Sequence, residues 1–459
     1  MSIGFSAVAI PALVSYDQTQ ISWFASMASL ATPLGCVVSG PIADRFGRKI
    51  AIAVVNTTAF IGWIIVGSAY YLTEQQYAVI LVGRFMTGLA TGLCGTPAAV
   101  YMAEIASPEL RSVFTTWVSL FYALGIFWVY LLGFLFKDDW GTISFIGAAF
   151  PLVGMIFLKY FIPESPSWLV AKNRVDEAKN NMCKLYGTKN YDEDVQSEIE
   201  ILLSSRGQKK YTHQKTLPQQ FAKKVKLLMR RSFWKPFLLV ITYFFFQQFT
   251  GIFVIMFYAI DIVKGAKVEM DAYVTIVLIA TARLVAMLLL SYCSKHYGRR
   301  PLSILSGTGM AICMLILGSY ILCIKQGIID EENEKKLAMI PVILLILYFF
   351  ISTMGFYPIP FALSSEVYPR NIRGTAAGLG AGANFLFNFI TVKIYPSMVD
   401  SMSSYGVFFF YGGMSVIGTI FVIFFLPETR GKTLEEIQDY FVKKKEDNFT
   451  NRLEKGDTA

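Results

Sequence analysis

The chain has 459 residues, of which 54% are hydrophobic and 16% are charged, and its formal net charge is +9. Soluble domains contain about 25% charged residues, so an ordinary soluble protein is excluded, and the mean hydropathy of +0.50 agrees. The six cysteines and two histidines form no closely spaced set, so we expect no disulfide framework, metal site or cofactor.

Apolar residues occur in twelve blocks, most of them long enough to cross the hydrocarbon core of a bilayer as a helix. The blocks are residues 2–14, 20–42, 50–72, 76–102, 112–136, 142–162, 236–263, 271–293, 302–324, 338–362, 374–396 and 406–426. Lipid offers no partner for open backbone groups, so the chain is predicted to be an all-α polytopic membrane protein. A β-barrel is excluded because its strands would alternate in short segments.

The first block is shorter than a bilayer-spanning helix. Residues 2–14 have the length of a signal-peptide core, but neither a basic start nor a cleavage site accompanies them. We therefore expect a first transmembrane helix that is truncated in this chain.

Lysine and arginine gather in alternate loops, which predicts the orientation in the membrane. DRFGRK at 44–49 follows the second block, KHYGRR at 295–300 follows the eighth, and the polar segment 172–235 is strongly basic. We expect these loops and both termini in the cytoplasm, with the plasma membrane as the location. The positive charge therefore indicates topology and not nucleic-acid binding.

The one long polar segment divides the chain into six blocks and six. Its helical spacing with i,i+4 charge pairs indicates short cytoplasmic helices. The predicted domains are an N-terminal six-helix bundle at 1–165, a cytoplasmic helical linker at 166–235, a C-terminal six-helix bundle at 236–428 and a cytoplasmic tail at 429–459.

The two halves also repeat each other in sequence. GPIADRFGRK at 40–49 has its counterpart in SYCSKHYGRR at 291–300, and the segment from Glu104 to Arg111 has its counterpart from Glu366 to Arg373. Halves repeated about a pseudo-symmetry axis are the construction of many secondary transporters. The alternative is that these are merely positive residues that set topology, which two equivalent copies make less favourable.

These residues resemble the sugar porter family of the major facilitator superfamily. GPIADRFGRK matches the superfamily's G-x-x-x-D-R-x-G-R-K loop in full. The family's other marks are GRFMTG (83–88), VYMAEIASPELR (100–111), PESPSWL (163–169), QQFTG (247–251), PIPFALSSEVYPRNIRG (358–374) and PETRGKTLEEI (427–437). ATGLCGTPAAVYMAEI and NFITVKIYP further resemble the insect facilitated trehalose transporter-like branch. The resemblance implies the major facilitator fold, with twelve transmembrane helices in two six-helix pseudo-symmetric bundles.

The resemblance also implies alternating access, in which the two bundles rock about a site near the bilayer midplane. Charged groups at the cytoplasmic helix ends would form pairs between the bundles and close the inner side. The matching residues are Asp44, Arg45, Arg48, Glu104, Arg111, Arg299, Arg300, Glu366 and Arg373. The alternative is interfacial snorkelling combined with topology. Lys295 stands where the family often has an acid, so one such pair is in doubt.

Neutral amides inside apolar helices indicate a substrate site, because they are costly there without partners. Gln247 and Gln248 lie early in the seventh block, and Asn384 and Asn388 share one face of the eleventh. The resemblance implies that Gln247, Gln248 and Asn384 contact sugar hydroxyls. The alternative, strongest for Asn388, is that these amides join helices to one another.

Several positions depart from the family's binding set. Ser119 replaces a glutamine, Phe253 and Arg283 each replace an asparagine, and Phe361 replaces a tryptophan. Tyr258 keeps one of the paired tyrosines that usually lie above the site. These changes leave fewer hydrogen-bonding groups for an ordinary hexose.

Three cations lie inside apolar blocks. Arg283 is deep in the eighth block and could bond substrate hydroxyls, attract an anion, or pair with a backbone carbonyl or an aromatic face. Arg84 and Lys393 lie nearer the outer ends of their helices, where we expect the side chains to snorkel towards the interface.

Proton-linked relatives usually carry an acid early in the first helix, where this chain has Ser6. We therefore expect facilitated diffusion of a sugar such as trehalose or a hexose. The alternatives are a proton-coupled sugar symporter, a transporter-like nutrient sensor, and a carrier of another polar solute. An enzyme is not expected, since no nucleotide loop, metal-ligand spacing or Ser/His/Asp set is present. The expected partners are a small sugar and the lipid bilayer, for a monomeric protein.

Overall fold

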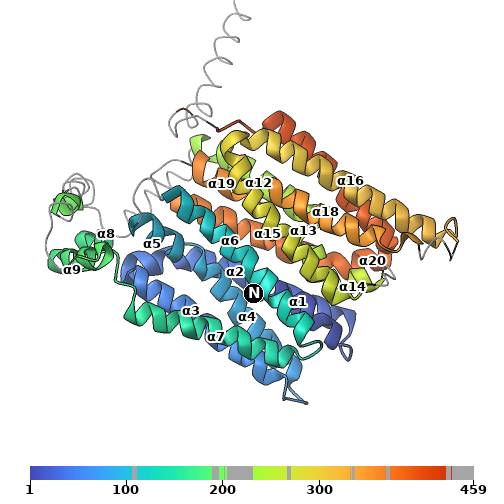
Figure 1. The fold of residues 1–459 in the computed structure, drawn as a ribbon, viewed down its shortest axis with the longest axis horizontal. Coiled ribbons are helices and arrows are strands. Elements are labelled where there is room, and N and C mark those ends of the chain that lie inside the picture. Colours follow the sequence, from blue (N-terminus) through green and yellow to red (C-terminus); the bar gives the residue numbers. More distant parts are fainter. Residues whose placement is uncertain are drawn as a thin grey trace, which may run out of the picture.

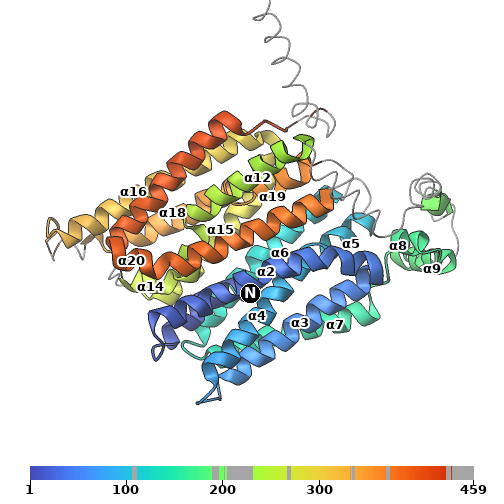
Figure 2. The ribbon, with the colours of Figure 1, turned by 180° about the vertical axis from the view of Figure 1, so that it is seen from behind.

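The computed structural model describes residues 1–105, 111–188, 196–200, 202–203, 231–265, 270–330, 332, 336–368, 373–430 and 436. Regular structure within these residues is helical throughout, as the sequence predicts. Figures 1 and 2 show two groups of long helices side by side, the first built from the N-terminal half of the chain and the second from the C-terminal half.

The N-terminal half contains the first six predicted blocks. Its elements are α1 (Ser2–Ala9), the 3₁₀ helix η1 (Ile10–Ala12), α2 (Gln18–Phe46), α3 (Arg48–Ala69), α4 (Gln76–Cys94), α5 (Pro97–Ile105), α6 (Arg111–Leu135) and α7 (Trp140–Tyr160). Two short helices then follow, α8 (Pro166–Ala171) and α9 (Val175–Tyr186). They lie in the segment for which short polar helices are predicted, while residues 204–230 of that segment lie outside the described residues.

The C-terminal half contains the other six predicted blocks. Its elements are α12 (Arg231–Phe249), α13 (Ile252–Phe257), α14 (Ala259–Gly265), α15 (Ala272–His296), α16 (Arg299–Lys325), α18 (Ile340–Met354), α19 (Ile359–Val367) and α20 (Arg373–Phe425). The last two blocks form the one long helix α20, which kinks at Ser403 (φ 60°). Among the described residues, eight helical segments are long and apolar enough to cross a membrane by length and composition.

Two helices of the C-terminal half are broken where polar side chains gather. The segment α12–α13 is interrupted at Thr250 and Gly251, where Gly251 has a φ of 88° that favours glycine. The segment α18–α19 is interrupted between Gly355 and Pro358. Irregular backbone inside a membrane needs protein partners for its polar groups, so both breaks mark places where side chains must supply hydrogen bonds.

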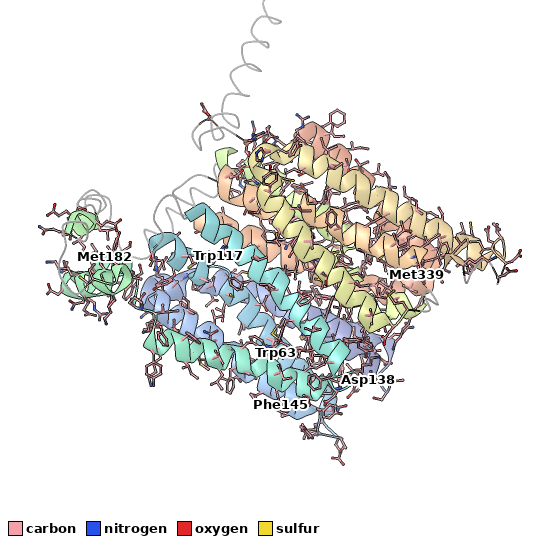
Figure 3. The ribbon with its side chains drawn as sticks, viewed as in Figure 1. Trp63, Trp117, Asp138, Phe145, Met182 and Met339 are labelled. Carbon is pink, nitrogen blue, oxygen red and sulfur yellow. The ribbon has the colours of Figure 1, made fainter. Side chains whose placement is uncertain are left out.

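The two ends of the bundles differ in charge. One end carries residues 44–49, α8, α9, residues 296–300 and residues 427–430, and we call it the basic end. The other carries residues 13–17, 136–139, 271 and 400–405, and we call it the opposite end. Figure 3 marks them, with Met182 of α9 at the basic end and Asp138 and Met339 at the opposite end.

Glycines allow α2 and α4 to pack closely. A Cβ atom at Gly88 would lie 2.1 Å from the carbonyl oxygen of Ala28, and one at Gly92 would lie 2.0 Å from that of Thr32. The hydroxyl of Thr32 also donates to the carbonyl of Gly88 (3.1 Å). Small residues that permit such an approach are typical of helix pairs in membranes. The halves themselves meet where α2 packs against α20 and where α6 packs against α15.

This packing predicts that one added methyl group between α2 and α4 lowers the stability of the protein. We expect Gly88→Ala to reduce the free energy of unfolding in mixed micelles by about 1–3 kcal/mol or more, because its Cβ meets backbone that cannot move aside. Gly413→Ala is the matched control, since a Cβ there meets no atom within 4 Å. Equal stability of the two variants would contradict the packing described for α2 and α4.

Candidate functional site

Four predicted amides come together in the centre of the molecule. Gln247 and Gln248 lie on α12, directly before the break at Gly251, and Asn384 and Asn388 lie on α20. Each of the four side chains is at most 1% exposed. Helices far apart in the sequence therefore place two glutamines opposite two asparagines, away from bulk water.

Gln247 bonds the break between α18 and α19. Its Nε2 donates to the carbonyl of Tyr357 and, at 3.5 Å, to that of Phe356. Because a carbonyl can only accept, these two bonds fix which way the amide faces. The Oε1 atom of Gln247 is consequently buried with no hydrogen-bond partner among the described residues.

The other amides form a chain of hydrogen bonds, which we call the amide relay and which consists of Ser29, Asn388, Gln248 and Asn384. The Ser29 hydroxyl donates to Asn388 Oδ1 (2.5 Å), and Asn388 Nδ2 donates to Gln248 Oε1 (3.1 Å). Gln248 Nε2 in turn donates to Asn384 Oδ1 (2.7 Å). The relay ends at Asn384 Nδ2, which is buried and has no partner in the described part of the chain.

The cluster therefore offers one unpaired acceptor, Gln247 Oε1, and one unpaired donor, Asn384 Nδ2. Each unpaired buried polar atom costs about 1–3 kcal/mol. A ligand hydroxyl can both donate and accept, so a polyhydroxylated molecule has the chemistry to satisfy both atoms.

Aromatic side chains pack against one another on the helices that carry these amides and on their neighbours. Tyr258 packs against Tyr395 with ring centroids 4.7 Å apart, and its buried hydroxyl has no partner among the described residues. Phe361 on α19 packs edge-to-face on Phe244 of α12 at 4.9 Å. Ser119, the remaining predicted contact, lies on α6, and its side chain is outside the described residues.

Arg283 is buried, and it forms no ion pair with a carboxylate of the described residues. It is 3% exposed, it donates to the sulfur of Met256 (2.8 Å), and its guanidinium lies 5.5 Å from the ring centre of Phe349 and 5.1 Å from that of Tyr357. No acid among the described residues forms an ion pair with it. Of the alternatives left by the sequence, aromatic faces are its partners here, with a thioether beside them.

Arg84 does not snorkel, and that prediction was wrong. Its side chain is 0% exposed. The guanidinium donates to the Ser6 hydroxyl (2.6 Å) and the Ser2 carbonyl (2.8 Å), and it lies over the rings of Phe5 and Phe24. The packing of α1 against α4 explains the difference. Polar groups of α1 accept the hydrogen bonds that the guanidinium would otherwise make with water at the interface. Lys393 is half-buried, donates to the Ser22 hydroxyl (2.7 Å) and lies 4.2 Å from the ring of Trp23.

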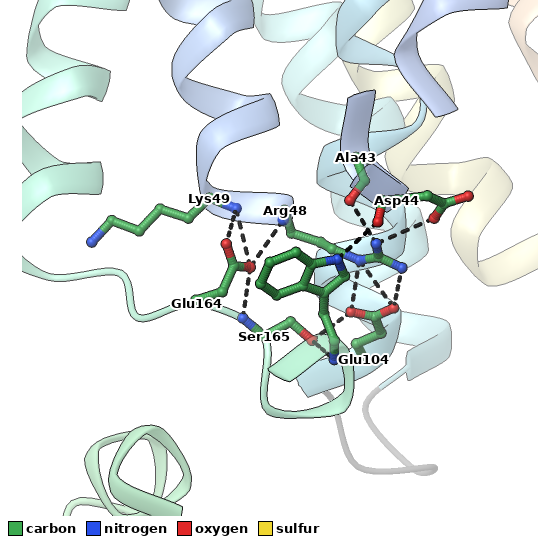
Figure 4. Close-up of polar contacts among 8 residues, drawn as sticks. Ala43, Asp44, Arg48, Lys49, Glu104, Glu164 and Ser165 are labelled. Carbon is green, nitrogen blue, oxygen red and sulfur yellow. Dashed lines mark hydrogen bonds and ion pairs between the residues drawn. The ribbon is translucent and has the colours of Figure 1, made fainter. Parts of the chain in front are cut away.

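At the basic end, the side chain of Glu164 caps the N-terminus of α3 (Figure 4). The Glu164 carboxylate accepts from the backbone N–H groups of Arg48 (2.9 Å), Lys49 (3.1 Å) and Ser165 (2.9 Å). Arg48 then pairs with Glu104 (2.8 Å) and Asp44 (3.2 Å). A carboxylate on open N–H groups at a helix N-terminus is favoured by the helix dipole, so Glu164 ties α7 and α3 together.

The same arrangement recurs in the C-terminal half. Glu428 accepts from the backbone N–H groups of Arg299 (3.0 Å) and Arg300 (3.1 Å) at the start of α16, and Arg299 pairs with Glu366 (2.9 Å). Hydroxyls complete both copies, since Ser165 donates to Glu104 (2.5 Å) and Thr429 donates to Glu366 (2.7 Å). We call these two arrangements the carboxylate caps.

Two glycines leave room for these caps. A Cβ at Gly47 would lie 2.3 Å from Glu164 Oε2, and a Cβ at Gly298 would lie 2.1 Å from Glu428 Oε2. Burial raises the pKa of the Glu428 carboxyl, but hydrogen bonds from the N–H groups of Arg430, Arg299 and Arg300 outweigh it, so the pKa lies below its usual value. The cap therefore carries a negative charge at neutral pH.

The pairs seen here lie within a half, whereas pairs between the bundles are expected from the sequence. Arg48 and Glu104 belong to the N-terminal half, and Arg299 and Glu366 to the C-terminal half. Arg45 is exposed over the ring of Phe46, and Arg300 also donates to the Ile423 carbonyl. The side chains of Arg111, Lys295 and Arg373 lie outside the described residues.

Polar contacts between the halves lie at the centre and the opposite end. Lys137 pairs with Asp271, the Tyr273 hydroxyl donates to Asp138 (2.9 Å), and the Tyr130 hydroxyl donates to the Met256 carbonyl (2.8 Å). Hydrogen bonding to Lys137 lowers the pKa of Asp271. Between the described residues of the basic end, no such contact joins one half to the other.

Sequence reasoning did not single out Glu164, Glu428 and Ser29, whose side chains make these bonds between helices. The repeated tripeptides Pro-Glu-Ser (163–165) and Pro-Glu-Thr (427–429) carry the signal for the first two, because each follows the sixth block of its half. Ser29 has no such signal, since a lone serine in an apolar helix is usually bonded within its own helix.

The carboxylate caps predict matched losses of stability. We expect Glu164→Ala and Glu428→Ala each to lower the free energy of unfolding by about 1–3 kcal/mol at pH 7, because N–H groups at the helix start lose their acceptor. Since the pKa of Glu428 is lowered, its contribution is present at neutral pH and is lost as the pH falls below the ordinary range of glutamate.

Glu332→Ala is the control for both, as Glu332 forms an exposed i,i+4 pair with Lys336 that is worth little. Denaturant unfolding of the three variants at pH 7 measures the difference. A control that loses as much as the cap variants would contradict the assignment.

Known proteins resemble this chain along most of its length. The family model described as Sugar (and other) transporter matches residues 8–441. The facilitated trehalose transporter Tret1 of Aedes aegypti is 29% identical over 450 residues, which cover 95% of this chain and 53% of that protein. Tret1 of Drosophila virilis is 30% identical over 449 residues, which cover 95% of this chain and 47% of that protein. The chain thus spans about half the length of the curated relatives it matches.

Solved structures share its fold. The inward-open xylose transporter XylE from E. coli matches with a TM-score of 0.77 at 20% identity, covering 96% of each chain. The proton:xylose symporter XylE bound to 6-bromo-6-deoxy-D-glucose matches with a TM-score of 0.71 at 21% identity, again over 96% of each chain. These matches confirm the predicted major facilitator fold of two six-helix bundles. Because the family model extends from residue 8 to residue 441, the chain belongs to the sugar (and other) transporter family, a family of transporters and not of enzymes.

Proposed function

We propose that this chain is a facilitative carrier that moves a sugar such as trehalose or a hexose across the plasma membrane by alternating access. The observation that carries the proposal is the pair of unpartnered buried atoms, Gln247 Oε1 and Asn384 Nδ2. Sugar hydroxyls that donate to the first atom and accept from the second recover the hydrogen bonds that both atoms lack. Membership of the family and the names of the trehalose-transporting relatives support the same substrate class.

The contacts between the halves support alternating access. They hold the halves together from the relay to the opposite end, through Ser29–Asn388, Tyr130–Met256 and Lys137–Asp271. The carboxylate caps tie helices within each half at the basic end. We infer that each half moves as a unit, and that opening the opposite end requires the Lys137–Asp271 pair to separate.

The surroundings of Arg84 support uniport. Where proton-linked relatives usually carry an acid, Ser6 donates no proton at neutral pH but accepts a bond from the Arg84 guanidinium. A buried carboxylate beside an arginine can change its charge with the substrate, whereas a hydroxyl in its place cannot. A proton-coupled symporter is therefore the less favoured alternative.

One observation favours a second candidate, a carrier of another polar solute with an anionic group. Arg283 is a buried cation that forms no ion pair with an acid among the described residues. If an anion were the substrate, Arg283→Asn would abolish its transport and increase hexose transport. Unchanged sugar selectivity in that variant would exclude this candidate.

Counterflow in liposomes tests the proposed function. We expect vesicles loaded with unlabelled trehalose or glucose to take up the labelled sugar, and an inward proton gradient to produce no accumulation above the outside concentration. Vesicles treated with a protonophore serve as the control. No counterflow of any sugar would refute sugar transport, and proton-driven accumulation would refute uniport.

A second prediction tests the site itself. Asn384→Ala removes the unpaired donor and also the acceptor used by Gln248, so we expect the sugar concentration at half-maximal counterflow to rise roughly tenfold, as about 1.4 kcal/mol of lost hydrogen bonding implies. Ser415→Ala is the control, because this buried hydroxyl of the same helix donates to the Tyr411 carbonyl one turn earlier. Equal affinity in both variants would show that Asn384 does not contact the sugar.

A further inference from the structure

Lys393 joins the two halves near the opposite end. It lies on α20 and is half-buried, and its ammonium group donates to the Ser22 hydroxyl of α2 (2.7 Å) and lies 4.2 Å from the ring centre of Trp23. A longer bond reaches the Thr19 carbonyl at 3.5 Å. Each hydrogen-bond and ring partner of this lysine among the described residues therefore belongs to the N-terminal half.

The halves touch along two pairs of helices, and a lysine lies at the opposite end of each pair. One pair is α2 and α20, where Lys393 lies, and the other is α6 and α15. Just after α6, Lys137 pairs with Asp271, which caps the N-terminus of α15. Both lysines thus bond across the boundary between the halves, at the end where the described residues show the halves joined.

The Lys393 contacts depend on how close the two halves lie. A cation is attracted to an aromatic ring within about 6 Å of the ring centre, and a hydrogen bond has a shorter reach still. Trp23 also packs against Phe389 of α20, with ring centroids 6.1 Å apart. A movement that separates α2 from α20 at the opposite end therefore takes Lys393 away from its partners.

We propose that Lys393 stabilises the state of the carrier that is closed at the opposite end. This inference rests on the proposed function. Opening that end costs the contacts of Lys393 with Ser22 and Trp23 as well as the Lys137–Asp271 pair. Sugar arriving at the opposite end binds only the open state, so its apparent affinity is reduced by the fraction of carrier in that state.

Spin labels on the two halves measure this equilibrium without sugar. One label is attached at Glu74→Cys, between α3 and α4, and the other at Ser401→Cys of α20, since both residues are exposed. The six native cysteines are replaced, and double electron–electron resonance in nanodiscs then distinguishes shorter distances, from the closed opposite end, from longer ones. Lys393→Met keeps a long apolar side chain and removes the charge. We expect it to raise the ratio of longer to shorter distances about fivefold, which corresponds to about 1 kcal/mol.

Lys325→Met is the matched control. Lys325 of α16 also donates to a hydroxyl, that of Ser403 (3.0 Å), and also lies over a ring, that of Tyr405 (5.0 Å). All three residues belong to the C-terminal half, so we expect the wild-type ratio. Lys393→Arg keeps the positive charge and is expected to stay near the wild-type ratio, because a guanidinium also binds aromatic faces.

A variant of the ring tests the contact from its other side. We expect Trp23→Leu to raise the ratio in the same direction as Lys393→Met. The double variant should raise it by less than the product of the two single factors, because both changes remove the same contact. Trp23→Leu also serves as the test if Lys393→Met fails to fold.

The outcomes separate this inference from the proposed function. A Lys393→Met protein with the wild-type ratio would overturn the inference, and so would an equal rise in Lys325→Met. A double variant whose factor equals the product of the single factors would also overturn it, since the two residues would then act independently. A wild-type protein that moves neither labelled trehalose nor labelled glucose would instead refute the proposed function, because the distances are measured without sugar.

Discussion

A polar atom that is buried away from water costs free energy unless the protein supplies a hydrogen-bond partner, and most of this structure follows from that constraint. The apolar blocks become helices because only a helix pairs its own backbone groups in lipid. Where a helix breaks, as between Gly355 and Pro358, a side chain supplies the missing bond, and Gln247 does so for the carbonyl of Tyr357. The same constraint explains the surroundings of Arg84, whose guanidinium donates to a hydroxyl and a carbonyl and lies over two aromatic rings.

The carboxylate caps show how a duplicated sequence yields two units of equal construction. Glu164 and Glu428 each join the end of the sixth transmembrane segment of a half to the start of its third. Such caps stabilise the helix ends of one half without bonding it to the other. Among the described residues of the basic end, no hydrogen bond or ion pair joins the two halves.

Much of the fold can be predicted from the sequence, because the length of each apolar block and the charge of each loop are local properties of the chain. All twelve blocks fall in helices, and the central glutamines and asparagines meet as their chemistry suggests. Three features could not be predicted from the sequence. The snorkelling prediction for Arg84 fails because depth along a helix does not reveal what packs beside it. The partners of Arg48 and Arg299 are in their own halves, which spacing cannot distinguish from the other half. Ser29 acquires its partner from a helix 359 residues away in sequence.

The account centres on two atoms that the described protein leaves unpaired, Gln247 Oε1 and Asn384 Nδ2. They explain why a family fold with several substituted contact positions, Phe253 and Arg283 among them, still has the chemistry for a polyhydroxylated substrate. The most direct test is a structure of the protein determined with trehalose or glucose bound. We predict sugar hydroxyl oxygens within hydrogen-bonding distance of both atoms. A sugar bound elsewhere, with both atoms bonded only to water or to protein, would contradict the account.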